Sequence, residues 1–216
     1  MPWGLTRYHH TGQSHFATFS CYHRRPLFTT DANRRVFENG LERVRHSFRL
    51  RVYGYVVMPE HIHLLVSEPE RNAPLKPTPG LNGPPRPTSG LNGAPTLADA
   101  LKSLKQGVAR RLIGDAEHFW QKRYYDFNVR DHAQFVEKLH YIHWNPVRRG
   151  LCEQAEDWAW SSFLHHATGV VGLVEIESEW TARKREREAG RTLSRRGTAP
   201  LKPKSGLNGP PAKIGL

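Results

Sequence analysis

The chain has 216 residues, of which 38% are hydrophobic, and 32 Lys and Arg against 20 Asp and Glu give it a formal net charge of +12. This length and composition allow one sizeable domain with additional polar segments, and the excess of positive charge favours nucleic acid as the partner. No stretch approaches the roughly 20 apolar residues of a membrane-spanning helix, and the first residues lack the apolar run of about 7 to 15 residues of a secretory signal. We therefore expect a cytoplasmic, nucleoid-associated protein with no membrane partner.

Two cysteines, Cys21 and Cys152, are far apart in the sequence. They form neither a disulfide framework nor a zinc-type CxxC pair. Both are expected to be reduced packing residues.

The first third of the chain shows strand and helix patterns in alternation. A strand is indicated at 14–23, and a helix from Asp31, where Val36, Leu41, Val44 and Phe48 recur at roughly helical spacing. Residues 51–58 are rich in β-branched and aromatic types, and 61–68 follow after Pro59 and Glu60. These two segments predict a hairpin that supplies the central strands.

A segment rich in Pro, Gly and Asn follows at 72–95. Its first part, APLKPTPGLNGPP at 73–85, recurs near the end of the chain as APLKPKSGLNGPP at 199–211. Pro fixes φ and removes a hydrogen-bond donor, and Gly adds chain entropy, so neither copy is expected to pack into a core. We interpret 72–95 as a flexible insertion, and the copies as translated repeats of a DNA element without a catalytic role.

The strongest helical pattern of the chain begins after Thr96. Apolar residues recur along one face from Leu97 to Leu112, and Thr96 with Asp99 fits an N-terminal capping box. The other face carries basic side chains that either are solvated or face a phosphate backbone: Lys102, Lys105 and Arg110.

A strand is indicated at 120–130, and a last helix at 131–145, where Pro146 disfavours continuation. The order β-α-β-β-α-β with one further helix predicts an α+β fold, a ferredoxin-like antiparallel sheet with helices packed on it. We expect this domain to occupy 1–166 and a charged tail to occupy 167–216, with a charged helix or tail at 181–196 that adds to DNA affinity.

Two histidines in the second strand of the hairpin are candidate metal ligands. Residues i and i+2 of a strand share a face, so His61 and His63 project together while Ile62, Leu64 and Val66 face the core. Taken alone, an HxH pair is more often two half-exposed polar residues on a sheet, because the chain has 13 His.

The last helix supplies further candidates. At about 100° per residue, Phe135, Leu139 and Ile142 form its apolar stripe, and Tyr141 and Asn145 form a polar row at the edge of that stripe. Lys138 lies beside this row. The row either packs as an amphipathic flank or faces the two histidines, in which case a phenol, an amide oxygen and two imidazoles surround one ion.

That set of groups suits phosphodiester cleavage. A bound metal polarises a non-bridging phosphate oxygen and orients the phosphate while a hydroxyl attacks in line. Tyrosine suits the attack because a phenol, with a pKa near 10, is far more acidic than an aliphatic hydroxyl. The product, a phosphotyrosine with a free DNA hydroxyl, stores the energy for rejoining a strand without ATP.

Four motifs identify the family that the chain resembles: MPEHIHLLV at 58–66, FWQKRYYDFNVRD at 119–131, YIHWNPVRRGL at 141–151 and DWAWSSF at 157–163. Their order and spacing resemble the REP-associated tyrosine transposases, which are HUH endonucleases similar to the insertion-sequence transposases that use a single tyrosine. The resemblance covers roughly 8–166 without the insertion. The insertion departs from the family pattern, and it could loosen the link between the metal face and the helix after Thr96.

The resemblance implies a role for each candidate. His61 and His63 would be the metal pair, Asn145 the third ligand, and Tyr141 the nucleophile that forms a 5′-phosphotyrosine. It also implies Mg²⁺ or Mn²⁺ and single-stranded DNA containing hairpins of repetitive extragenic palindromes. The insertion-sequence relatives are dimers with shared active sites and the REP-associated group looks monomeric, so monomer and homodimer both stay open.

Basic and aromatic side chains around the proposed site are candidate DNA contacts: Arg123, Arg130, Arg148, Arg149, Tyr124, Tyr125 and Trp144, with Lys105 on the preceding helix and Arg24 and Arg25 as weaker candidates. Two other functions remain possible at this point. One is a domesticated, non-catalytic DNA- or RNA-binding module, since ferredoxin-like sheets also serve RNA recognition. The other is a zinc hydrolase, although the chain has no third His, Cys or carboxylate at a recognisable ligand spacing and no HExxH helix.

Overall fold

The computed structural model describes residues 12–70 and 94–197 and the side chains of the last helix as far as residue 189. The chain divides into two compact units, Met1–Thr181 and Ala182–Leu216. The repeat copies at 72–95 and 199–211 lie outside the described residues, apart from Ala94 and Pro95. No helix in the described ranges is long and apolar enough to cross a membrane.

The first unit is built on a four-stranded sheet in the order β2-β3-β1-β4, with every neighbouring pair antiparallel. The strands are β1 (Ser14–Ser20), β2 (Val52–Val57), β3 (His61–Ser67) and β4 (Tyr125–Val129). This strand order and the alternation with helices confirm the predicted α+β fold, an antiparallel sheet with helices packed on it. β4 and β2 are the edge strands, so β1 and β3 are central. The prediction that both hairpin strands are central is therefore wrong for β2.

The strand expected at 120–130 is shorter than predicted, because β4 begins only at Tyr125. Trp120 makes an isolated bridge to Cys21. The Trp120 indole donates to the carbonyl of Lys105 at 2.8 Å, and the Lys105 ammonium donates to the carbonyl of Gln121 at 3.0 Å. The amide of Gln121 donates to the carbonyl of Ser20 at 2.9 Å, and the amide of Tyr22 to that of Phe119 at 2.8 Å. The pairing with the β1 side of the sheet is therefore interrupted between Gln121 and Tyr125.

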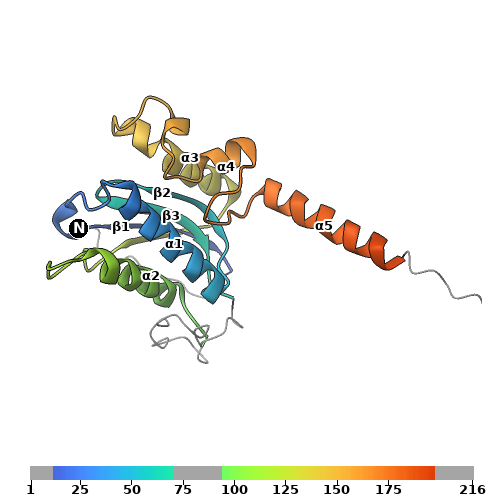
Figure 1. Ribbon diagram of the computed structural model, residues 1–216, viewed down its shortest axis with the longest axis horizontal. Helices are drawn as coiled ribbons and strands as arrows, with labels where there is room; N and C mark the ends of the chain where they lie inside the picture. The colour runs from blue at the N-terminus through green and yellow to red at the C-terminus, as the bar shows by residue number, and fades with distance from the viewer. Residues whose placement is uncertain (1–11, 71–93, 198–216) are drawn as a thin grey trace, which may run out of the picture. The chain divides into compact units, whose positions relative to one another are not determined.

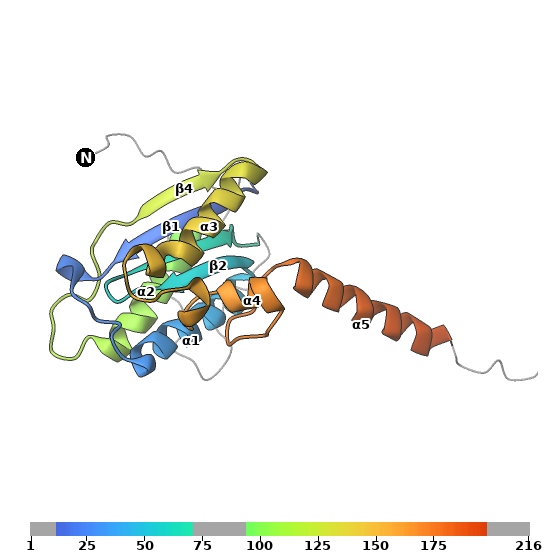
Figure 2. The ribbon, with the colours of Figure 1, turned by 90° about the horizontal axis from the view of Figure 1, so that it is seen from above.

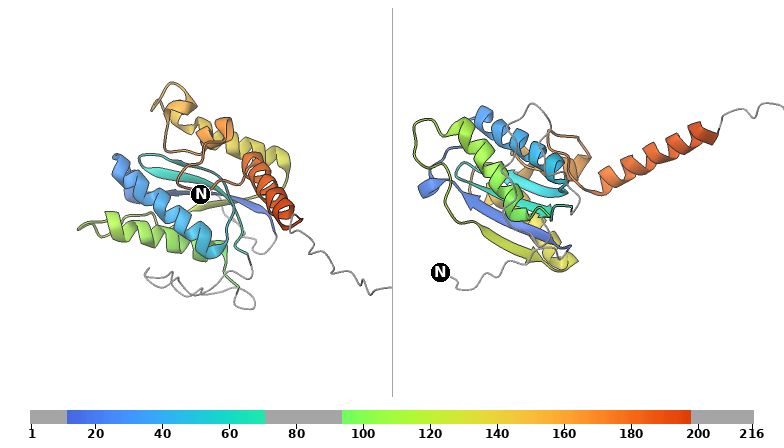
Figure 3. Two further views of the ribbon diagram at one scale, coloured as in Figure 1. Left: turned by 45° about the vertical axis from the view of Figure 1, so that its right-hand side comes forward. Right: turned by 90° about the horizontal axis from the view of Figure 1, so that it is seen from below.

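Two helices, α1 (Asp31–Phe48) and α2 (Leu97–Leu112), cover one face of the sheet, as Figure 1 and the right-hand view of Figure 3 show. The predicted capping box is present: Thr96 accepts from the Asp99 amide, and the Asp99 carboxylate accepts from the Thr96 amide. At the start of the predicted apolar stripe of α1, Phe37 is buried and Val36 is only half-buried. The stripe therefore runs from Phe37 through Leu41, Val44 and Phe48, which is better helical spacing than the predicted one.

The opposite face is covered by α3 (His132–Arg148), which crosses the sheet in Figure 2. Ile142 is buried there, and Phe135 and Leu139 pack beside it as their spacing predicted. Gly54 of β2 permits the close approach, because a Cβ at this position would lie 2.5 Å from Leu139 Cδ1.

The helix expected to stop at Asn145 continues through Pro146 to Arg148. Pro146 lies in the last turn, where its missing N–H removes only one intrahelical bond. The amide of Arg149 still donates to the carbonyl of Asn145 at 3.1 Å, and Pro146 itself is buried. Packing of the last turn therefore outweighs the local preference to end the helix.

The DWAWSSF segment lies along the free edge of β2. Ser161 bridges Val56, and the amide of Val57 donates to the carbonyl of Trp160 at 2.9 Å. The segment runs between a 3₁₀ turn, η3 (Ala155–Asp157), and α4 (Phe163–Thr168). Covering this edge satisfies backbone groups that would otherwise be open to pairing with another chain.

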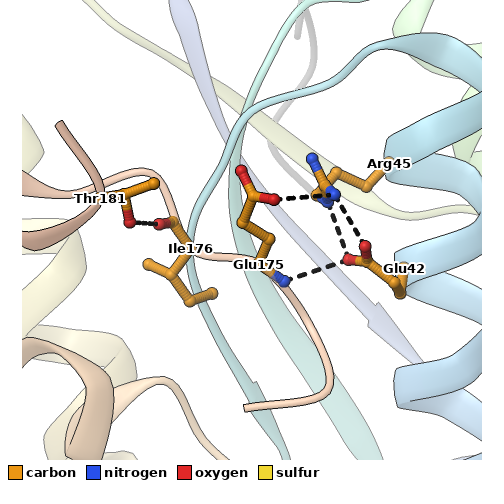
Figure 4. A network of polar contacts seen from close by, with 5 residues as sticks. All are labelled: Glu42, Arg45, Glu175, Ile176 and Thr181. Atoms are coloured by element: carbon orange, nitrogen blue, oxygen red, sulfur yellow. Dashed lines mark hydrogen bonds and ion pairs between the residues drawn. The ribbon is translucent and has the colours of Figure 1, made fainter. Parts of the chain in front are cut away.

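The first unit extends to Thr181, beyond the boundary expected at residue 166, because Val174 and Ile176 are buried in the core under α1 and α2. Figure 4 shows how this segment is attached. Arg45 of α1 bridges Glu42 and Glu175 with N–O distances of 2.7 and 3.3 Å, and the Glu175 amide donates to Glu42 at 3.1 Å. The Thr181 hydroxyl donates to the carbonyl of Ile176.

The last helix, α5 (Glu179–Gly197), begins in the first unit and supplies the described part of the second. Residues 182–189 are all exposed, and six of the eight are Arg, Lys or Glu. Of the two alternatives expected at 181–196, a charged helix or a charged tail, the structure has the helix.

Candidate active site

A pocket of about 430 Å³ opens between α3 and the central strands. Both predicted metal histidines, the predicted nucleophile and the predicted third ligand line it, so residues from two separate motifs meet at one place. Its lining residues are Phe16, Thr18, Ser20, Arg24, His61, His63, Tyr125, Lys138, Tyr141, Asn145 and Arg149.

Strand alternation places the two histidines as predicted. Ile62, Leu64 and Val66 belong to the core under α1 and α2, and His61 and His63 line the pocket on the α3 face. Their Nε2 atoms lie 3.0 Å apart.

Nδ1 of each ring, the nitrogen that does not face the other histidine, lies close to a polar side chain. Oγ1 of Thr18 lies 2.7 Å from Nδ1 of His63, and Oε1 of Glu60 lies 3.1 Å from Nδ1 of His61. The Glu60 carboxylate is an acceptor and the Thr18 hydroxyl can act as one, and with the proton of each ring on Nδ1 the Nε2 atoms keep their lone pairs. Two lone pairs then face each other at 3.0 Å, an arrangement that is stable only with a proton or a cation between them.

Burial keeps both rings uncharged. It lowers the pKa of His63 to about 3, helped by the nearby His61 and Arg149. Burial also lowers the pKa of His61, and Glu60 opposes this shift. Neutral imidazoles are the form that binds metal ions.

The residues fit a divalent ion. Two adjacent ligands of an octahedral ion at about 2.1 Å lie roughly 3.0 Å apart, which is the separation of the two Nε2 atoms. Asn145 Oδ1 is buried and has no hydrogen-bond partner among the described residues, so this carbonyl oxygen is available as a further ligand. Within the described ranges, no group of three His, Cys, Asp or Glu side chains could hold a metal.

Tyr141 lies directly beside the histidine pair. Its ring centroid is 5.0 Å from that of His63 and 5.9 Å from that of Phe16, with edge-to-face geometry in both cases. The ring therefore lies on the same side of the sheet as the proposed ligands. Asn145, one helical turn further along α3, is on the same flank, as the spacing predicted.

Positive charges surround the pocket. Arg149 lines it and donates to Glu60 at 2.6 Å, so Glu60 joins Arg149 to His61. The guanidinium of Arg148 lies 5.9 Å from the Tyr141 ring centroid. Arg24 reaches the lining from a tight turn in which its φ is 53°, a left-handed value that non-glycine residues rarely adopt.

Several predicted DNA contacts lie away from this pocket. Arg123 and Arg130 are exposed, and Trp144 is 40% exposed and stacks on His140. Tyr124 and Lys105 line a separate pocket beside α2. Of the two adjacent tyrosines, therefore, only Tyr125 lines the pocket that contains His61 and His63. Contacts of these residues with DNA stay predictions.

The sequence reasoning missed the two residues that orient the histidines. Glu60 could have been suspected because it directly precedes the HxH pair. Thr18 could not, because its place opposite His63 depends on the register between β1 and β3.

No protein-family model matches the chain, but known proteins do. The REP-associated tyrosine transposase of Escherichia coli K12 is 23% identical over 174 residues, which cover 79% of this chain and 87% of that protein. A Haemophilus influenzae protein that carries the same family name is 24% identical over 164 residues, 70% of this chain and 80% of that protein. A solved structure of a REP-associated tyrosine transposase bound to a REP hairpin matches with a TM-score of 0.59 and 20% identity over 82% of this chain and 93% of that one.

The chain resembles the REP-associated tyrosine transposases. The resemblance predicted from four motifs is thereby confirmed, and the sheet with its packed helices is the fold of the solved transposase. Three of the four motifs form distinct parts of the structure. MPEHIHLLV forms β3 with its histidine pair, YIHWNPVRRGL forms the second half of α3, and DWAWSSF covers the edge of β2.

Proposed function

We propose that this chain is a metal-dependent transposase that cleaves and rejoins single-stranded DNA containing palindromic hairpins, with Tyr141 as the nucleophile. The observation that carries the proposal is the 5.0 Å separation of the Tyr141 and His63 rings. The transposase relatives and the solved transposase bound to a REP hairpin support it.

In this mechanism His61, His63 and Asn145 would hold Mg²⁺ or Mn²⁺, which when bound polarises the scissile phosphate and orients it for in-line attack. The Tyr141 oxygen forms a bond to phosphorus as the bond from phosphorus to the 3′ oxygen breaks. The phenol proton passes to solvent, and the leaving 3′ oxygen takes up a proton. The product is a 5′-phosphotyrosine, and attack on it by a 3′ hydroxyl reverses the step.

Other residues of the pocket would position the DNA. Lys138, Arg24 and Arg149 bring positive charge to the lining, where they can neutralise backbone phosphates. Tyr125 lines the same pocket and is 43% exposed, so an unpaired base can stack on its ring.

One copy of the chain supplies all four central residues of this pocket. His61 and His63 come from β3 and Tyr141 and Asn145 from α3. The proposed chemistry therefore needs no side chain from a second copy, which supports a monomer as the active form.

The test is adduct formation. Wild type, Tyr141→Phe and the matched variant Tyr125→Phe are incubated with a labelled single-stranded hairpin and Mg²⁺ or Mn²⁺, and covalent adducts are separated on denaturing gels. We expect an adduct with wild type and Tyr125→Phe, and none with Tyr141→Phe or after chelation of the metal. An undiminished adduct in Tyr141→Phe contradicts the nucleophile, and tight hairpin binding with no adduct in any variant would support a non-catalytic binding module instead.

A further inference from the structure

A second pocket, of about 320 Å³, lies beside α2. Its walls come from one side of this helix and from the residues that lead into β4. It is lined by Ala98, Leu101, Lys102, Lys105, Gln106, Trp120, Gln121, Lys122 and Tyr124. None of these residues lines the pocket of the histidine pair.

The lining combines aromatic rings, amides and positive charge. Trp120 and Tyr124 supply the rings, and the Lys105 ammonium lies 6.0 Å from the centroid of each. Lys102 and Lys122 are exposed at this pocket, and no Asp or Glu is among its lining residues. A pocket with apolar flat walls, amide groups and cations is complementary to a base attached to a phosphate.

The two pockets lie on opposite faces of the sheet at the same edge strand. Tyr124 packs against the core under α1 and α2, whereas the next residue, Tyr125, lines the pocket under α3. β4 pairs only with β1, so its outer edge carries no further strand in the described part of the chain. A nucleic-acid strand that passes around this edge can reach both pockets.

We propose that the pocket beside α2 binds an unpaired base of DNA, while Lys102 and Lys122 contact the neighbouring phosphates. The proposal rests on the proposed function in that the DNA is the hairpin substrate. Under this proposal the DNA is recognised on the face of the sheet covered by α2 and cleaved on the face covered by α3.

The charge requirement is tested by hairpin binding in a Tyr141→Phe background, so the measurement does not depend on cleavage. The variant Lys102→Glu with Lys122→Glu is compared with Arg49→Glu with Arg51→Glu, a control pair of exposed residues that changes the net charge equally and lines neither pocket. We expect the first pair to weaken binding by about tenfold or more beyond the control pair, and to reduce the slope of log K against log salt by about 1.4 to 1.8. Equal affinities and slopes for the two pairs would overturn the proposal.

The base requirement is tested with hairpins in which each unpaired base in turn is replaced by an abasic site. One position is expected to weaken binding by about 5- to 150-fold, the range of a lost base stack, and Tyr124→Leu is expected to shrink that loss. If no abasic position matters, or if Tyr124→Leu of unchanged melting temperature leaves the loss intact, the pocket does not hold a base. These results can be distinguished from a failure of the proposed function. In that case wild type would give no Tyr141-dependent adduct, whatever the binding measurements show.

Discussion

Thr18 of β1 and His63 of β3 are cross-strand partners, and Oγ1 of Thr18 lies 2.7 Å from Nδ1 of His63. The hydroxyl fixes the ring so that Nε2 points to the Nε2 of His61, 3.0 Å away. The register of two central strands therefore decides which nitrogen faces the proposed metal site.

Thr18→Val should weaken Mn²⁺ binding by about tenfold or more, because the valine cannot hold the His63 tautomer and partners of this kind typically contribute 10- to 100-fold to metal affinity. Thr18→Ser keeps the hydroxyl and should bind like wild type. Isothermal titration with Mn²⁺ measures both, and equal affinities for valine and serine would show that Thr18 does not orient the ligand.

Asn145→Ala should also weaken Mn²⁺ binding, since it removes the buried carbonyl oxygen that has no hydrogen-bond partner among the described residues. Asn145→Asp should bind at least as tightly as wild type, because a carboxylate is a stronger ligand for these hard cations. Asn39→Ala, at an exposed position of α1, is the matched control. The ligand assignment fails if Asn145→Ala and Asn39→Ala titrate alike by electron paramagnetic resonance of free Mn²⁺.

Gly54→Val should lower the free energy of unfolding by about 1–3 kcal/mol, the usual cost of overpacking a core. A side chain at this position meets Leu139 Cδ1 at 2.5 Å and Ser162 Oγ at 3.3 Å, so either the Leu139 side chain or α3, which also carries Tyr141, must move. The fraction of DNA converted to adduct should fall as well. Gly172→Val is the control, because nothing lies within 4 Å of a Cβ there; similar urea unfolding curves for the two variants would contradict this account of α3 packing.

His143 should make the protein less stable in acid. Burial lowers its pKa to about 3, with smaller contributions from His166 and His140, and its Nε2 lies 2.9 Å from Ser162 Oγ. The unfolded chain binds a proton at this residue near pH 6.5, whereas the folded chain does so only near pH 3. Between these values the unfolded state holds more protons, so stability falls as the pH falls.

Chemical unfolding of wild type and His143→Asn between pH 7 and pH 5 checks this. The difference in unfolding free energy, wild type minus variant, should shrink by about 1.4 kcal/mol per pH unit once the pH is below about 6. A difference that stays constant over this range would mean that His143 binds its proton as readily in the folded chain as in the unfolded one.

Much of the fold could be predicted from the sequence, because hydrophobic periodicity separates strands from helices and their order restricts the topology. The errors arose where a tertiary partner decides the local structure. Trp120 makes only an isolated bridge to Cys21 while its indole bonds to α2. Pro146 stays helical because it is buried, and Val174 and Ile176 belong to the core although the domain was expected to end at residue 166.

The candidate site was predictable to the extent that it depends on local spacing. His61 and His63 share a face because they are two apart in a strand, and Tyr141 and Asn145 because they are four apart in a helix. Whether these two faces oppose each other depends on the side of the sheet on which α3 packs, and periodicity does not encode that choice. For the same reason Lys105 and Tyr124, predicted beside the site, lie at a second pocket.

The most direct test is to identify the amino acid that carries the DNA. The adduct formed with a single-stranded hairpin and Mn²⁺ is digested with nuclease and protease, and the modified peptide is sequenced by mass spectrometry. We predict a 5′-phosphonucleotide on Tyr141 alone. A nucleotide attached to Tyr124, Tyr125 or any other residue would contradict the central claim that Tyr141 is the nucleophile beside the His61 and His63 pair.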